Sequence, residues 1–190
     1  ASARPAATGD KLSMFSLKMA GVQDKDRLIG YYPLDNVKIS GEIVNLDIPQ
    51  AQNGQFVAQP LIGSTIHSAS RATGDEMILR PTAAYIVVGV AKGDTRITKV
   101  ELKSNAGEAI AGDVTLDTSD GSFSAKSDNV TVSYPSGLDC KAEITYITMM
   151  VAPAVLSKGY TIKFTCSKGF VEDIVENEAT EFKAGACTVL

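Results

Sequence analysis

Short runs in which apolar and polar residues alternate recur along the chain, most clearly at 110–116, 130–134 and 160–166. Successive side chains of a β-strand point to opposite faces, so this period of two predicts strands with one buried face. The runs 85–90 and 146–151 are apolar at nearly every position, which is typical of central strands. Helical spacing is confined to 20–28, where a turn or two of helix is predicted.

Turn signals separate these runs. Asn105-Ala106-Gly107, Asp120-Gly121, Pro135-Ser136-Gly137 and Lys168-Gly169 combine residues that favour tight turns. Their spacing of roughly 8–15 residues favours a sandwich or barrel over βαβ units. The sequence therefore predicts an all-β fold, a two-sheet β-sandwich with about nine or more strands and less than about 15% helix.

One face of these strands is predicted to form the core. Its members are Ile86, Val88, Val100, Leu102, Val114, Leu116, Val130, Val132, Ile144, Tyr146, Ile162 and Phe164.

The chain divides into a leader and one domain. Residues 1–11 are small, polar and proline-bearing, and are expected to be flexible. Residues 12–190 are predicted to form a single β-sandwich domain. Within it, 50–74 is rich in Gln, Ser, Gly and Ala and is predicted to be an irregular connection.

Composition and charge exclude several classes of function. The formal net charge is −4, which offers no basic surface to nucleic acid or to an anionic membrane. No apolar run approaches the roughly 18 residues of a membrane-spanning helix. Composition and charge therefore predict no direct contact with a membrane.

Residues able to carry chemistry are few, and no catalytic, cofactor-binding or metal-binding residue is predicted. The chain has a single histidine, His67, and three widely spaced cysteines, Cys140, Cys166 and Cys187. Cys166 continues an inward alternation and is expected to be a buried thiol. A Cys140–Cys166 bridge stays open for an oxidising compartment. No nucleotide-binding, nucleophile-elbow or zinc-protease motif is present, so no enzymatic activity is expected.

Three weaker patterns have structural explanations. Residues 117–121 are similar to a calcium loop but lack a third oxygen ligand and a downstream glutamate, which favours a hairpin turn. The triplet Asn129-Val130-Thr131 matches an N-glycosylation acceptor but lies inside a predicted strand. The acidic residues of 172–181 indicate an exposed sheet edge, where charge opposes unwanted strand pairing.

An ordered set of segments resembles the fimbrillin-like proteins of Bacteroidetes, the family of type V pilus subunits. Tyr31-Tyr32-Pro33 leads into "VKISGEIVNLDIPQAQNGQ" (37–55), followed by "LRPTAAYIVVGV" (79–90) and "ITKVELKSNAGEAIAGDVTLD" (97–117). "YITMMVAPAVLSKGYTIKFTCSKG" (146–169) and "FKAGACTVL" (182–190) complete the set. The chain departs from the family in having no tryptophan upstream of Tyr31, and two-domain members are longer.

The resemblance implies a transthyretin-like β-sandwich of the fimbrillin N-terminal-domain type, exported as a lipoprotein to the outer membrane and cell surface. It also implies a structural or adhesive fimbrial (pilus) subunit whose partners are other fimbrial subunits, bound by β-strand addition. A host or bacterial surface protein or a glycan is a further expected partner. Neither Arg4 nor Arg27 carries a processing motif, so neither is assigned as a cleavage site.

An alternative is a carbohydrate- or protein-binding β-sandwich module of a surface lipoprotein. Such a module would show a row of exposed aromatic side chains, for which Tyr31, Tyr32 and Phe56 are the candidates. Residues 12–19 alternate apolar residues with Ser and Lys. We expect them to form an edge strand whose removal opens a groove for a donor strand, or else an ordinary N-terminal strand.

Overall fold

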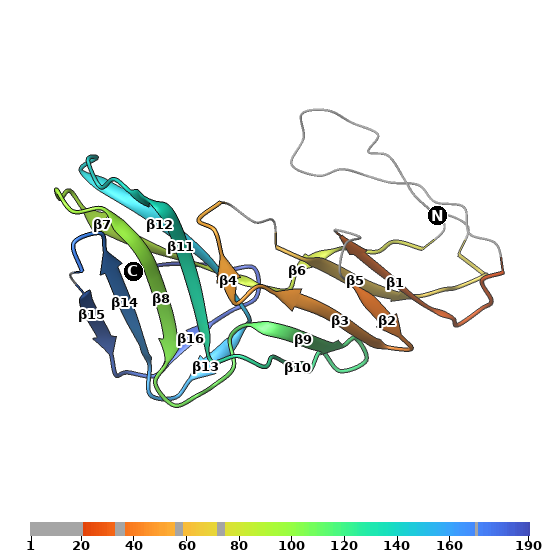
Figure 1. The fold of residues 1–190 in the computed structure, drawn as a ribbon. Coiled ribbons are helices and arrows are strands. Elements are labelled where there is room, and N and C mark those ends of the chain that lie inside the picture. The colour runs from red at the N-terminus through yellow and green to blue at the C-terminus, as the bar shows by residue number, and fades with distance from the viewer. Residues whose placement is uncertain (1–20, 33–36, 56–58, 72–74, 170) are drawn as a thin grey trace.

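A computed structural model describes residues 21–32, 37–55, 59–71, 75–169 and 171–190, and in these ranges the chain is all-β (Figure 1). They contain seventeen strands and no helix, which confirms the predicted fold class. The transthyretin-like assignment stays a prediction. The expected leader at 1–11 and the expected strand at 12–19 lie outside the described residues.

The strands follow one another in a regular order. The first nine are β1 (Arg27–Tyr32), β2 (Lys38–Ser40), β3 (Ile43–Ile48), β4 (Ala51–Gln52), β5 (Leu61–Ile66), β6 (Arg80–Pro81), β7 (Ala84–Ala91), β8 (Ile97–Ser104) and β9 (Gly112–Asp117). The others are β10 (Phe123–Ser124), β11 (Asn129–Leu138), β12 (Ile144–Val151), β13 (Ala154–Leu156), β14 (Tyr160–Cys166), β15 (Val171–Glu176), β16 (Thr180–Phe182) and β17 (Cys187–Val189).

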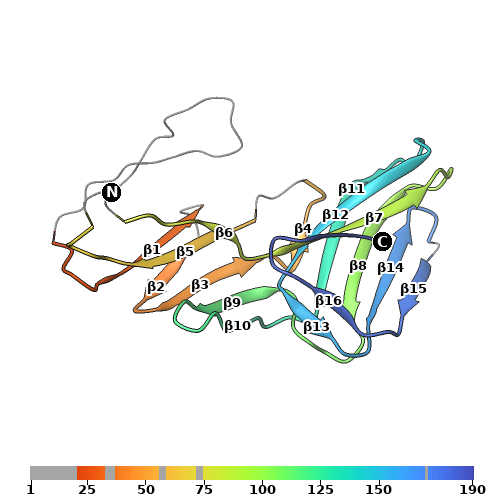
Figure 2. The same cartoon turned by 180° about the vertical axis from the view of Figure 1, so that it is seen from behind.

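Two layers form the larger part of the molecule, which we call the sandwich. One is a five-stranded sheet of order β15-β14-β8-β11-β4, and the other is a three-stranded sheet of order β12-β7-β17. Figures 1 and 2 show the two sheets lying face to face. Their facing side chains, among them Val100, Leu102, Ile162, Ile86 and Met149, are buried in one core. The pair β13 and β16 lies at one end, where the rings of Tyr160 and Phe182 are 6.0 Å apart.

A smaller lobe extends from one side of the sandwich. It consists of the sheets β1-β5-β6 and β10-β9-β3-β2 (Figure 1). Gly30 and Gly63 are cross-strand partners in β1 and β5. A Cβ added at Gly30 would lie 2.5 Å from the Sδ of Met77, and one at Gly63 would meet the carbonyl oxygen of Ile78. The two glycines therefore allow the segment that precedes β6 to pack directly on the sheet.

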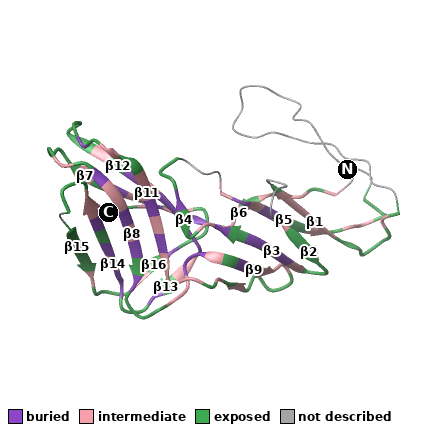
Figure 3. Cartoon of the chain, viewed as in Figure 1, coloured by how far each residue is buried: buried purple, intermediate pink, exposed green. Residues whose placement is uncertain are grey.

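The core prediction was largely confirmed. Nine of the twelve residues are buried, and Leu116 is partly buried against the core (Figure 3). The prediction was wrong for Ile144 and Tyr146, which are 49% and 61% exposed. The register of β12 with β7 pairs Ile147 with Val88 and Met149 with Ile86, which turns the odd-numbered residues inward. A shift of one residue moves every side chain of a strand to the other face.

Two local predictions also differ from the structure. The segment 50–74, expected to be irregular, contains β4 and the six-residue β5. Ladder bonds to β1 give β5 its regular form despite its Gly, Ser and Thr residues. The part of 20–28 that is described forms turns and the start of β1, with no helix. There the pairing of Arg27 with Ile66 decides the conformation.

Candidate functional site

The two sheets of the sandwich are joined along one side, which we call the closed side. Here β4 lies parallel to β11, and the side chain of Gln52 reaches across to β12. The Gln52 Nε2 donates to the carbonyl of Met150 at 2.8 Å, and the Met150 N–H donates to the Gln52 Oε1 at 3.1 Å. A buried amide side chain thus makes the two bonds that a neighbouring strand residue would make.

The opposite side is bounded by β17, and we call it the open side. Three backbone hydrogen bonds join β17 and its ends to β7. The N–H of Tyr85 donates to the carbonyl of Ala186 at 2.9 Å. The N–H of Leu190 donates to the carbonyl of Val87 at 2.8 Å, and the N–H of Gly89 donates to the carbonyl of Leu190 at 3.0 Å. In a parallel pair, every second residue of a strand directs both its N–H and its C=O toward the same neighbouring strand. The N–H and C=O groups of Cys187 and Val189 therefore point away from β7, and no described strand pairs with them.

The five-stranded sheet is wider than the sheet that covers it. Because β12 contacts β11, counting strands in the same direction places β7 over β8 and β17 over β14, and leaves no strand of the three-stranded sheet over β15. Ile174 of β15 is the cross-strand partner of the buried Ile162, so both side chains point to the core face. Ile174 is nevertheless 50% exposed, while Ile162 is 1% exposed. One strand position beside β17, opposite β15, is therefore unfilled among the described residues.

Acidic side chains flank Ile174 on this inner face. Glu172 is the cross-strand partner of Phe164, and Glu176 is the partner of Tyr160, so both point the same way as Ile174. Neither carboxylate has a described Lys or Arg within ion-pair distance, and Glu176 Oε1 accepts from the N–H of Glu178 at 2.8 Å. Burial raises the pKa of Tyr160, and the negative charge of Glu176 raises it further. The unfilled strand position is therefore an apolar spot between two negative charges.

Two side chains hold the end of the sandwich where β8 ends and β14 begins. The Asn105 Nδ2 donates to the carbonyls of Lys158 and Glu176, each at 2.9 Å, and so attaches the end of β15. Glu108 accepts from the N–H of Ser157 at 2.8 Å and from its hydroxyl at 2.6 Å, and also from the hydroxyl of the buried Ser104. These hydrogen bonds, with Ser104 and then Ser157 contributing most, lower the pKa of Glu108 to about 2.

The outer face of the three-stranded sheet carries an exposed apolar patch. A Cβ added at Gly89 would lie 3.4 Å from Ile144 Cγ2 and 3.7 Å from Tyr146 Cε1, so both side chains lie over the glycine. Val189 of β17 is also exposed, at 67%. The sequence predicted Tyr146 to lie in the core, but its aromatic ring forms a flat part of this exposed patch.

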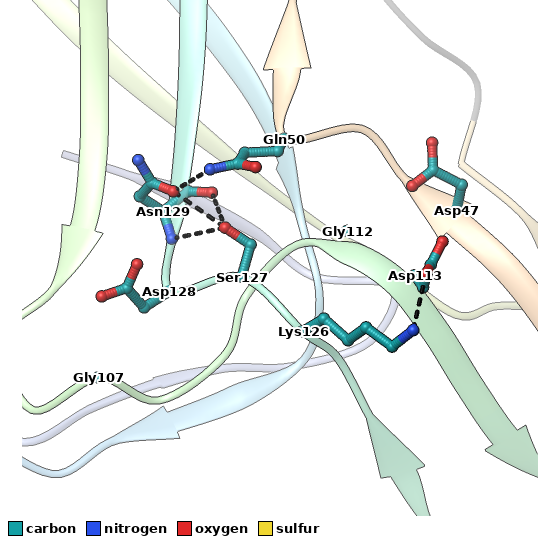
Figure 4. A pocket seen from close by; sticks show the side chains of 9 residues that line it. All are labelled: Asp47, Gln50, Gly107, Gly112, Asp113, Lys126, Ser127, Asp128 and Asn129. Atoms are coloured by element: carbon teal, nitrogen blue, oxygen red, sulfur yellow. Dashed lines mark hydrogen bonds and ion pairs between the residues drawn. The ribbon is translucent and has the colours of Figure 1, made fainter.

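A polar depression of about 680 Å³ lies where β3 and β9 approach the start of β11 (Figure 4). Asp47 and Asp113 are cross-strand partners at its edge, and Lys126 Nζ lies 2.8 Å from Asp113 Oδ2. Burial raises the pKa of Asp47 and the charge of Asp113 raises it further, whereas Lys126 lowers the pKa of Asp113. The depression has no aromatic residue in its lining.

The expected aromatic row is not assembled among the described residues. Tyr31 packs partly buried against the core, whereas Tyr32 next to it is exposed. Phe56 lies outside the described residues.

The remaining polar candidates have structural roles. Asp75 accepts from His67 Nδ1 and from the N–H of Ser68 at 3.1 Å, and the hydrogen bond from His67 is the largest cause lowering the pKa of Asp75. Gly121 donates to the carbonyl of Asp117 at 2.8 Å, which confirms the predicted turn. No group of three or more His, Cys, Asp or Glu side chains suited to a metal ion occurs in the described ranges.

The cysteines and the glycosylation triplet are also placed. Cys140 is buried, Cys166 is partly buried and Cys187 is exposed, and all three are free thiols. Burial is the main cause that raises the pKa of Cys140. Asn129 lies at the start of β11, as predicted, and accepts at its side-chain oxygen from Gln50 and Ser127.

Comparisons with known proteins support the fold. No protein-family model matches the chain, and no curated protein matches it. Among solved structures, the chain is similar to a "putative cell adhesion protein" from Bacteroides ovatus. The TM-score is 0.54 and the identity 13%, and the match covers 93% of this chain and 69% of the other. No described helix is long and apolar enough to cross a membrane.

Proposed function

We propose that the chain is a structural or adhesive subunit of a bacterial cell-surface fimbria that assembles with other fimbrial subunits by strand addition. The observation that carries this proposal is the unfilled strand position beside β17, opposite the half-exposed Ile174. A strand entering there would bond to the outward N–H and C=O groups of Cys187 and Val189. Main-chain bonds supply affinity in this mode of binding, and alternate side chains supply fit.

Two further observations support a role at the cell surface. The Bacteroides ovatus protein with a similar fold is described as a "putative cell adhesion protein". The segments from Tyr31 onward resemble fimbrillin-like proteins, which are exported as lipoproteins to the outer membrane. The proposal assigns no catalysis, no cofactor and no nucleic acid to the chain, and membrane attachment only through a lipid anchor.

The second candidate is a carbohydrate- or protein-binding module of a surface lipoprotein, favoured by the exposed ring of Tyr146. Sugar sites combine an aromatic surface with polar groups that bond hydroxyls. Tyr146 is surrounded by Ile144, Gly89 and Val87, while the polar depression is lined by other residues. This separation makes the apolar patch better suited to a protein than to a glycan.

Immunogold electron microscopy of cells that produce the protein tests the proposal. Antibodies against the chain should label surface filaments along their length. The variant Val189→Pro should be absent from filaments, because proline removes the outward N–H without touching the bonds that Leu190 makes to β7. Label confined to the cell interior, or Val189→Pro incorporated as well as the wild type, would contradict strand addition at this edge.

A further inference from the structure

We infer that the strand accepted on the open side carries a basic, an aliphatic and a basic residue at positions i, i+2 and i+4, and that residues 1–190 of a second copy do not supply it. This inference rests on the proposed function, since it names the partner of the same unfilled position.

The inner face of β15 sets the pattern. Glu172, Ile174 and Glu176 occupy alternate positions and point to the same side. A strand inserted beside β17 would face them across the roughly 10 Å that separates packed sheets. Its inward side chains also alternate, so one residue would pack on Ile174 and the residues two positions before and after it would face the two glutamates.

Charge decides which residues fit the outer two positions. Inserting a strand removes water from Glu172 and Glu176, and burying a carboxylate without an opposite charge beside it is costly. Neither carboxylate is neutralised by a described Lys or Arg, because Lys163 lies by Asp173 at 3.9 Å and Lys183 by Glu181 at 3.2 Å. Lys and Arg are long enough to span the gap with their charged ends and to lay their methylene groups along the apolar surface. The central position requires an aliphatic residue because it covers Ile174.

The sequence of the chain itself does not contain this pattern. Among its Lys and Arg residues, two pairs are spaced four apart, Lys92 with Arg96 and Lys99 with Lys103. The residues between them are Asp94 and Glu101, which would place a third carboxylate over Ile174. Residues 1–190 of a second copy are therefore a poor donor, and the position fits a strand that carries the basic-aliphatic-basic pattern.

Fluorescence anisotropy with the full chain and three labelled peptides tests the inference. The peptides are Thr-Lys-Thr-Val-Thr-Lys-Thr and its counterparts with both Lys replaced by Gln or by Glu. Two partly shielded ion pairs correspond to about tenfold tighter binding of the Lys peptide than of the Gln peptide, and the Glu peptide should bind most weakly. The preference should shrink with added salt.

Matched variants of the chain locate the effect. The double variant Glu172→Gln/Glu176→Gln should bind the Lys and Gln peptides equally. The double variant Asp94→Asn/Glu143→Gln, which changes the net charge by the same amount at exposed positions elsewhere, should keep the preference. If both double variants lose it equally, the effect is one of net charge and the inference is overturned.

Val189→Pro separates this inference from the proposed function. It should abolish binding of the Lys and Gln peptides alike. Equal binding of both peptides to the wild-type chain, lost in Val189→Pro, would overturn the charge pattern and leave strand addition standing. Lys-peptide binding that persists in Val189→Pro would overturn the inference, and no binding by any peptide would contradict both.

Discussion

The two sides of the sandwich differ in whether the outward backbone groups of the edge strand have hydrogen-bond partners among the described residues. On the closed side, the amide of Gln52 bonds both backbone groups of Met150, so the edge of β12 is satisfied by a side chain. On the open side, Cys187 and Val189 direct their backbone groups outward. Ile174, on the edge strand of the five-stranded sheet, is half exposed. An unpaired edge beside an uncovered apolar residue is a template for another strand. Under the proposed function, the closed side contributes stability and the open side contributes binding.

The largest expected difference concerns the cross-strand partners Ile162 and Ile174. Ile162→Ala should lower the free energy of unfolding by about 2–5 kcal/mol, because it leaves a cavity in a closed core. Ile174→Ala removes the same atoms from a half-exposed site and should cost about 1 kcal/mol or less. Chemical denaturation of both variants measures the difference. Equal losses would show that β15 is covered in solution.

The next effect tests the closed side. Gln52→Ala leaves the buried N–H and C=O of Met150 without partners and should cost about 1–3 kcal/mol in denaturation experiments. Gln50→Ala is the matched control, since the side chain of Gln50 is exposed and, among the described residues, bonds only the side chain of Asn129. It should change stability by less than about 0.5 kcal/mol. A loss in Gln52→Ala no larger than that in Gln50→Ala would remove the basis for a closed side.

Acid should weaken the end of the sandwich where Glu108 bonds Ser104 and Ser157. The pKa of Glu108 is lowered to about 2 in the folded chain from an ordinary value of 4.5. The stability it contributes is therefore fully present above pH 4.5 and is lost as the pH falls from 4.5 toward 2. Denaturation at several pH values should show Glu108→Gln less stable than the wild type at pH 6, with the difference shrinking below pH 4.5. The protection factor of the Ser157 amide against hydrogen exchange should fall in acid, while that of Met150 should stay high. A difference independent of pH would contradict this role of Glu108.

The smallest expected effect on stability is that of Val189→Pro. The N–H it removes has no partner in the described chain, so the free energy of unfolding should change by less than about 0.5 kcal/mol. Thr188→Pro is the control, because Thr188 is in register with Ile86 and its N–H faces β7. It should be clearly the less stable of the two in thermal unfolding. The reverse order would mean that the outward edge of β17 has been assigned to the wrong residues.

The alternation of apolar and polar residues predicted most of the core but not which face of β12 is buried. Polar and apolar residues alternate over 100–103 of β8, over 129–134 of β11 and throughout β14, so the buried face could be identified from the sequence. In β12, Ile144 and Tyr146 are apolar, and so are Ile147, Met149 and Met150. With apolar residues on both faces, alternation carries no information, and the register with β7 selects the buried set.

The sequence by itself determined that this chain is all-β, where most of its turns lie, and that conventional catalytic motifs are absent, because these properties depend on residues close together along the chain. The tertiary structure decided which strands lie at the edges and which edge is satisfied. Gln52 and Met150 are 98 positions apart, and nothing near either residue indicates the other. Likewise, the exposure of Ile174 depends on how many strands the opposite sheet contains, a property of the assembled layers rather than of the segment 171–176.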